Sequence, residues 1–295
     1  MGYVFLLASQ ICSGIKGYCG KMMSGFVKNV QGAVFMNMLR TVLCTAISLI
    51  VILVSGNQGG LAIAPVPLLI SALSGVATAV FLASWLLCVR ESAYMMLDVF
   101  LMLGTLVPTV VGYFMFSEII SLRQWIGFAI LLLAVLIMCS YNNSIKVKIT
   151  PAALALLILC GFANGSLNLA QKSFVKFCPD VSISLFNLYT YIFASLALGL
   201  FFLLMSRRGK VELDKQQTRR AVIYVLIMAS MLTAHSYLIT LAASNLDSMQ
   251  LYPLDRGMSL VVTTLMATFV FKEKFKIRAL VGIALAFAAL MIINL

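Results

Sequence analysis

Long apolar runs follow one another along nearly the whole chain of 295 residues. Each run has 19 to 25 residues, and a helix needs about 20 apolar residues to cross a hydrocarbon core about 30 Å thick. Because backbone polar groups in lipid must find partners within the protein, such runs predict helices. The ten runs lie near residues 3–23, 30–54, 66–89, 94–117, 120–140, 151–172, 181–205, 220–243, 248–271 and 277–295. The sequence therefore predicts an all-α integral membrane protein with ten transmembrane helices.

The composition argues against a soluble protein that binds nucleic acid. Only 10% of the residues are charged, whereas a soluble domain has about 25%. The net charge of +12 comes from basic residues in short loops, where they set the topology and attract anionic lipid. The seven cysteines show no metal-ligand spacing, and the 17 methionines suit the interior of a helix bundle. We therefore expect no nucleic acid partner, no metal and no cofactor.

The last quarter of the chain repeats its middle. A constant shift of 155 positions carries the Phe-x-Glu motif at 116–118 onto the same motif at 271–273, and seven residues in the two stretches are identical. Asn37 and Asn187 match near the starts of the second and seventh runs. A further motif, a glycine seven positions before a lysine, occurs in the first and sixth runs at Gly14 and Lys21 and at Gly165 and Lys172.

These matches divide the chain into two repeats of five helices each, residues 1–142 and residues 151–295. Since five is an odd number, the second repeat enters the membrane from the opposite side. The repeats are therefore expected to be inverted, related by an axis in the membrane plane, as in many secondary transporters.

The basic residues are distributed unevenly between the two sets of loops. Fifteen Lys and Arg residues fall on the side of the first, third, fifth, seventh and ninth loops. The other side has Arg123, Lys172 and Lys176. The positive-inside rule places the more basic side in the cytoplasm and both termini outside.

Taken together, these motifs resemble the drug/metabolite transporter superfamily, and within it the EamA-like transporters. The resemblance rests on the Gly-x6-Lys and Phe-x-Glu motifs and on two five-helix repeats. It implies a ten-helix fold with a central cavity, and export or uptake of small metabolites. Family members usually keep both termini in the cytoplasm, contrary to the charge count, which we prefer. Small multidrug-resistance relatives have a glutamate in their first helix, where this chain has Lys16 and no acid, so their proton-for-cation exchange is not transferred.

Ionisable side chains inside the apolar runs are costly in lipid and mark candidate functional sites. There are six of them: Lys16, Arg40, Asp98, His235, Asp255 and Arg256. A helix rises 1.5 Å per residue, which puts Arg40 near the midplane and Asp98 within reach of Lys16 or Arg40. Adjacent Asp255 and Arg256 point about 100° apart, so we expect at most one to face the cavity squarely.

The residues predicted to bind substrate are these six, with Asn187 and Tyr252 added as polar side chains expected in the same region. A structural role in ion pairs or at the membrane surface remains an alternative for the charged residues. For His235, a hydrogen bond between packed helices is the alternative, and we prefer it to a proton relay.

The residues of the repeated motifs are expected to have structural roles: Gly14, Lys21, Glu118, Gly165, Lys172 and Glu273. Glu118 and Glu273 lie where they can cap the N-termini of the following helices. Glycines spaced three or four apart, at 14–20 and 161–165, predict faces where helices approach closely.

The sequence favours a secondary transporter, and not an enzyme, in the plasma (inner) membrane as a multi-pass protein. By alternating access between the two repeats it would move a small polar metabolite, either an amino-acid-like zwitterion or a small anion. Its partners would be that solute, membrane lipids and a coupling proton carried by Asp98, Asp255 or His235. The protein would be a monomer or a homodimer.

Three alternatives remain open. A flippase for lipids or lipid-linked sugars would use the same fold, and an opening between helices would favour it. A membrane-embedded lipid-phosphate enzyme could hold a phosphate with Arg40 and Arg256, but the chain has one histidine and no Asp-rich metal motif. A scaffold without transport is disfavoured by the internal duplication.

Overall fold

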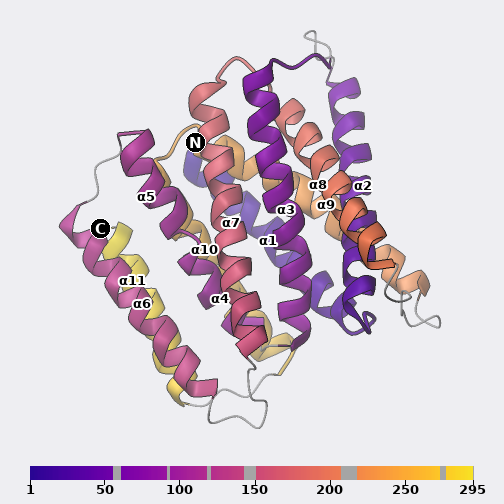
Figure 1. Ribbon diagram of the computed structural model, residues 1–295. Coiled ribbons are helices and arrows are strands. Elements are labelled where there is room, and N and C mark those ends of the chain that lie inside the picture. Colours follow the sequence, from indigo (N-terminus) through magenta and orange to yellow (C-terminus); the bar gives the residue numbers. More distant parts are fainter. Residues whose placement is uncertain are drawn as a thin grey trace.

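The computed structural model describes residues 1–55, 61–91, 94–117, 121–142, 151–206, 218–272 and 277–294. The regular elements in this part of the chain are all helices, and they form one bundle (Figure 1). They are α1 (Gly2–Ser24), α2 (Val30–Val54), α3 (Pro65–Glu91), α4 (Tyr94–Leu103), α5 (Leu106–Met115), α6 (Leu122–Asn142), α7 (Pro151–Phe177), α8 (Ile183–Ser206), α9 (Thr218–Ala243), α10 (Ser248–Leu265), the π-helix η2 (Met266–Val270) and α11 (Ile277–Asn294).

Each of the ten predicted segments contains helix, but the prediction of one continuous helix over 94–117 was wrong. The helix breaks at Gly104 and Thr105, whose amides bond three residues back instead of four. The break lies against α7, where a Cβ on Gly104 would collide with the carbonyl oxygen of Gly161 and a Cβ on Gly165 with that of Gly104. The glycines thus let two backbones touch, as predicted for 161–165.

The described helices are suited to lipid by length and by surface. Five are long and apolar enough to cross a membrane, at Val30–Val54, Pro65–Val89, Pro151–Phe177, Ile183–Met205 and Arg220–Ala243. Shorter apolar helices follow at Phe100–Met115, Leu122–Ala134 and Leu280–Ile293. Large hydrophobic side chains such as Ile11, Leu53 and Leu136 point outward and are more than half exposed. Lipid would cover them.

The closest helix pairs join the first half of the chain to the second. They are α1 with α9, α3 with α7, α2 with α8, and α6 with α11. Figure 1 shows α6 and α11 side by side at one edge of the bundle. The two proposed repeats match α1 to α7, α2 to α8, α3 to α9 and α6 to α11. Under this matching, the pair α1–α9 corresponds to the pair α7–α3. The other two pairs each join a helix to its own counterpart.

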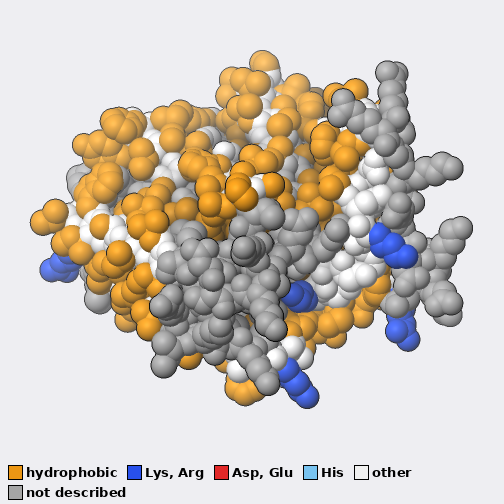
Figure 2. Space-filling model, turned by 60° about the horizontal axis from the view of Figure 1, so that its bottom comes forward, with side chains coloured by type: hydrophobic (Ala, Val, Ile, Leu, Met, Phe, Trp, Pro, Cys, Tyr) orange, Lys and Arg blue, Asp and Glu red, His pale blue; other side chains and the backbone are white. Residues whose placement is uncertain are grey.

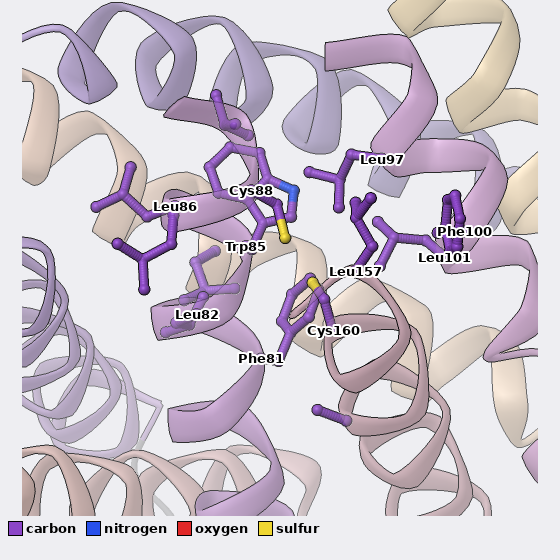
Figure 3. Close-up of a cluster of buried hydrophobic side chains, with 14 of the residues drawn as sticks. Phe81, Leu82, Trp85, Leu86, Cys88, Leu97, Phe100, Leu101, Leu157 and Cys160 are labelled. Carbon is purple, nitrogen blue, oxygen red and sulfur yellow. The ribbon is translucent and has the colours of Figure 1, made fainter. Parts of the chain in front are cut away.

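One part of the main apolar core lies where α3, α4 and α7 meet. Figure 3 shows side chains of these three helices converging, among them Trp85, Phe100 and Leu157. A Cβ on Gly20 of α1 would collide with the Trp85 ring, so this glycine makes room for the indole. Because lipid is as apolar as these side chains, close packing of this kind, and not escape from water, holds the helices together.

The two ends of the bundle differ in charge. Both termini lie toward one end, which we call the termini end and which is the upper end of Figure 1. Exposed Lys28, Arg220 and Lys272 lie at the opposite end, which we call the basic end. With that end turned forward, Figure 2 shows Lys and Arg side chains in blue, and no red is seen among the residues it describes.

The two Phe-x-Glu motifs share an unusual backbone conformation. Ser117 has φ 56° and Lys272 has φ 52°, both in the left-handed region that non-glycine residues seldom adopt. They occupy the same position of the motif, 155 residues apart. The helix caps predicted for Glu118 and Glu273 lie outside the described residues.

Candidate functional site

A polar cavity lies inside the bundle, lined by residues of α1, α2, α3, α4, α7, α8, α9 and α10. Its volume is about 60 Å³, which is room for a few water molecules, since one needs at least about 10–15 Å³ of such space. We call it the central cavity. Its charged or titratable residues include five that the sequence predicted to bind substrate: Lys16, Arg40, His235, Asp255 and Arg256.

Arg40, on α2, has the least satisfied charge in the cavity. Only 1% of its surface is exposed, and its Nε has no hydrogen-bond partner. Within the described part of the chain, Arg40 forms no hydrogen bond and no ion pair. A buried guanidinium is normally paired, because desolvating an unpaired charge costs several kcal/mol. Arg40 is therefore positioned to receive an anionic group from the cavity.

Asp255 and Arg256 form an ion pair on α10. Arg256 Nη2 lies 3.1 Å from Asp255 Oδ2, and the two side chains are 11% and 3% exposed. The amide of Gln10 on α1 donates to the other carboxylate oxygen, Asp255 Oδ1. Both residues line the cavity. The flexible arginine side chain bends back toward its neighbour, which the helical angle between the two Cβ atoms does not reveal.

His235 connects α9 to α1. Its Nδ1 lies 3.1 Å from the backbone carbonyl oxygen of Ser9, and because a carbonyl can only accept, Nδ1 carries the proton. The side chain is 9% exposed and lines the cavity. This contact matches the preferred interpretation of His235 as a hydrogen-bonded packing residue. Lys16 is half-buried and also lines the cavity.

Unpartnered polar atoms gather around this cavity. Of the ten buried side-chain nitrogen and oxygen atoms without a partner in the described residues, seven belong to residues that line it: Gln10, Arg40, Asn164, Asn168, Gln171, Thr190 and Arg256. An unsatisfied buried polar group costs about 1–3 kcal/mol, so these atoms need water or a bound solute. Their concentration at one place makes the central cavity the candidate binding site.

Several residues that line the central cavity did not enter the predicted site: Gln10, Gln171, Thr190, Tyr191 and Ser236. A signal for part of the set was present, because 164, 168 and 171 are spaced four and three apart on one face of α7. Residues 10, 13 and 17 have the same spacing on α1. Thr190 and Tyr191 lie in a strongly apolar helix and gave no pattern.

Two predicted residues with described side chains, Tyr252 and Asn187, are not found in the cavity wall. Tyr252 is fully buried beside Leu6 and Leu251, and its hydroxyl donates to the backbone oxygen of Asn168 at 2.7 Å. It faces away from the cavity, so it supports the wall and does not form it. Asn187 lines a separate chamber nearer the termini end. The side chain of Asp98, on α4, lies outside the described residues, and so does its predicted pairing with Lys16 or Arg40.

The lysine and glycine motif residues make helix contacts. Lys172 Nζ donates to the backbone oxygens of Leu246 at 2.7 Å and Ala243 at 3.3 Å, where α9 ends. Lys21 Nζ lies 6.0 Å from the centre of the Phe271 ring. A Cβ on Gly14 would lie 3.1 Å from Val262 Cγ1 of α10. Among the described residues, no three His, Cys, Asp or Glu side chains group as metal ligands would.

Comparison with known proteins defines the family of the second half and the fold of the whole. The fold is similar to that of 24 chains in solved structures. One of them, described only as "Crystal structure of protein", has a TM-score of 0.68 and 10% sequence identity, over 99% of this chain and 95% of that chain. At this identity the likeness shows the fold alone. No curated protein matches the chain.

The model of the EamA-like transporter family matches residues 151–295. Together with the apolar, membrane-length helices described above, this match supports a multi-pass membrane protein. The chain carries an EamA-like transporter domain at residues 151–295, consistent with the drug/metabolite transporter superfamily.

Proposed function

We propose that this protein is a secondary transporter that binds a small polar metabolite in the central cavity. The observation that carries the proposal is Arg40, which is fully buried and has no hydrogen bond or ion pair among the described residues. An anionic group of the solute supplies the missing partner. A hydrogen bond to a charged group contributes about 1.5–3 kcal/mol, so Arg40 would be the main anchor.

The same cavity holds a carboxylate, which favours a zwitterion over a simple anion. Asp255 is paired with Arg256 and Gln10, and an ammonium group of the solute would join this cluster. An amino-acid-like solute would thus present its carboxylate to Arg40 and its amine to Asp255. A small anion would use Arg40 and Lys16 and leave the Asp255 cluster unchanged.

Alternating access between two inverted five-helix repeats, residues 1–142 and 151–295, is the proposed mechanism. Three observations support it. The family match covers 151–295, the same range as the proposed second repeat. The pairing of α1 with α9 has its counterpart in α7 with α3. The two Phe-x-Glu motifs share a left-handed central residue.

The remaining assignments are also proposals. Ten membrane crossings would put all the odd-numbered loops at the basic end, and the positive-inside rule then puts that end in the cytoplasm. The membrane would be the plasma (inner) membrane, with both termini outside and the protein a monomer or homodimer. A coupling proton would be carried by Asp255, His235 or Asp98, since these are the acids and the histidine within the apolar runs.

Thermal stabilisation of the purified protein by amino acids, small organic anions, sugars and quaternary amines tests the proposal. A solute at 100 times its Kd stabilises the folded state by about 2.7 kcal/mol. We expect an amino acid or anion to stabilise the wild type, and Arg40→Ala to lose the effect through a roughly 10- to 150-fold weaker affinity. Arg123→Ala removes an exposed arginine on α6 and serves as the control. Equal stabilisation of wild type and Arg40→Ala would exclude Arg40 as the anchor.

A second candidate, a lipid flippase, is favoured by a groove between α1 and α10. This groove is lined almost entirely by apolar side chains and has a volume of about 680 Å³. Three residues in its wall also line the central cavity: Gln10, Gly14 and Val262. An acyl chain in the groove would bring its headgroup close to the cavity. Movement of a fluorescent anionic phospholipid across reconstituted vesicles, in preference to any soluble solute, would select this function.

A further inference from the structure

A second chamber lies between α2, α8 and α9, nearer the termini end than the central cavity. Its volume is about 380 Å³. Six hydroxyl side chains line it: Ser48, Ser55, Ser184, Ser230, Thr233 and Tyr237. Its other described residues are Asn187 and three aliphatic ones, so no Asp, Glu, Lys, Arg or His lines it within the described part of the chain. Ser55 follows the last residue of α2 and Ser184 lies in the first turn of α8, which places the chamber toward that end of the bundle.

Two side chains in the chamber wall have unpartnered atoms. Asn187 and Ser48 are each 2% exposed, and Asn187 Nδ2 and Ser48 Oγ have no hydrogen-bond partner in the described structure. In an apolar membrane bundle such groups are costly unless a ligand or water meets them. A wall with an amide and several hydroxyl groups, and with no charge among its described residues, suits a neutral, hydrogen-bonding group and not an ion.

A hydrogen bond between α9 and α8 joins the wall of this chamber to the wall of the central cavity. Ser236 Oγ on α9 donates to Asn187 Oδ1 on α8 at 2.9 Å. Ser236 lines the central cavity, whereas Asn187 lines the chamber. Gln171 Nε2 of α7 lies 3.5 Å from the same hydroxyl, on the cavity side. At this point a polar pair of side chains, Ser236 and Asn187, connects the walls of the two spaces.

We propose that the chamber is a second binding site on the solute pathway, for the uncharged hydrogen-bonding part of the solute, and that the Asn187–Ser236 pair is the gate to it. The proposal rests on the proposed transport function. A charged group stays at Arg40, because the chamber offers it no opposite charge. Hydroxyl or amide groups of the solute replace the gate bond by bonding Asn187 and Ser48.

The gate is tested by the reactivity of a reporter cysteine in the central cavity. Ser259→Cys places a thiol in the cavity wall, and its modification by a small charged thiol reagent is followed by peptide mass spectrometry, which leaves the native cysteines in place. Asn187→Ala and Ser236→Ala each remove the gate bond, and a rise in modification rate of roughly five-fold is expected from one hydrogen bond. Thr240→Val is the control, because the Thr240 hydroxyl bonds only within α9, to the backbone oxygen of Ser236 at 2.7 Å. No rise in either gate variant, or an equal rise in Thr240→Val, overturns the gate.

The binding site is tested by protecting a reporter in the chamber. Ser230→Cys places a thiol in the chamber wall, and we expect erythritol, a neutral polyol, to slow its modification while choline, a cation of similar size, does not. Equal protection by both, or by neither, overturns the site. Neither assay uses transport or Arg40. A positive result with no Arg40-dependent solute binding would therefore reject the transport function and keep the chamber, whereas the reverse pattern would reject the chamber alone.

Discussion

The glycines at equivalent positions of the two repeats should respond differently to alanine, because they meet different neighbours. A Cβ on Gly165 would collide with the backbone oxygen of Gly104 and lie 2.9 Å from Val107 Cβ and Cγ2. A Cβ on Gly14 would meet only the tip of Val262, at 3.1 Å. A side-chain methyl group can rotate away, whereas a carbonyl in the α4–α5 turn cannot move without separating α7 from that turn.

The magnitudes follow from two opposing effects. Alanine in a helix interior is favoured over glycine by about 0.5–1 kcal/mol, and overpacking a tight contact costs about 1–3 kcal/mol or more. For Gly165→Ala the collision dominates, and we expect a net loss of about 1–2 kcal/mol. For Gly14→Ala the two effects nearly cancel, so the change should stay within about 0.5 kcal/mol.

Thermal unfolding of both variants in the same detergent measures the difference. For chains of 150–250 residues, 1 kcal/mol shifts Tm by about 2–4 °C, so Gly165→Ala should melt several degrees below Gly14→Ala. If the two variants melt together, α7 can move away from the turn, and the backbone contact at Gly104 does not fix the packing of this region.

Two further changes test contacts around the site. Lys172→Met removes two hydrogen bonds from a charged donor to the end of α9 and should destabilise the fold by about 2–3 kcal/mol. The control is Lys176→Met, which alters an exposed lysine on the same helix. Equal Tm values for both variants would contradict the role of Lys172 in holding the end of α9. Tyr252→Phe removes the hydrogen bond to Asn168 and should lower the free energy of unfolding by about 1 kcal/mol. The Kd of the solute should not change, since Tyr252 does not line the cavity. A large change in Kd at unchanged Tm would contradict that placement.

Helix positions could be predicted well from the sequence because a helix that crosses a membrane needs an apolar run of about 20 residues, and such runs are visible in the sequence. The break at Gly104 could not, since it depends on a glycine meeting glycines 57 and 61 positions later, on α7. Five of the eight predicted binding residues line the central cavity, because ionisable side chains within apolar runs are costly in lipid and face the interior of the bundle. Their role in binding stays a prediction.

Tyr252 and Asn187 show where that reasoning fails. Both were predicted from being polar and at a suitable depth, but depth does not give direction around the helix axis. Tyr252 turns toward an apolar cluster with only its hydroxyl bonded, and Asn187 turns into a neighbouring space. Rotation about a membrane helix is set by packing partners, and in strongly apolar helices such as α8 the sequence pattern hardly encodes it.

The pairing of helices between halves has a consequence for how the protein is made. Each of the four closest pairs joins a helix within 1–142 to one within 151–294, so the first five segments reach the membrane before any of those partners exists. At synthesis rates of about 5–20 residues per second, the second half takes roughly 7–30 s to follow. During that interval, polar residues such as Gln10, whose hydrogen-bond partner is Asp255, are without their final neighbours. Insertion machinery or chaperones that shield them would therefore decide the yield of folded protein more than its final stability does.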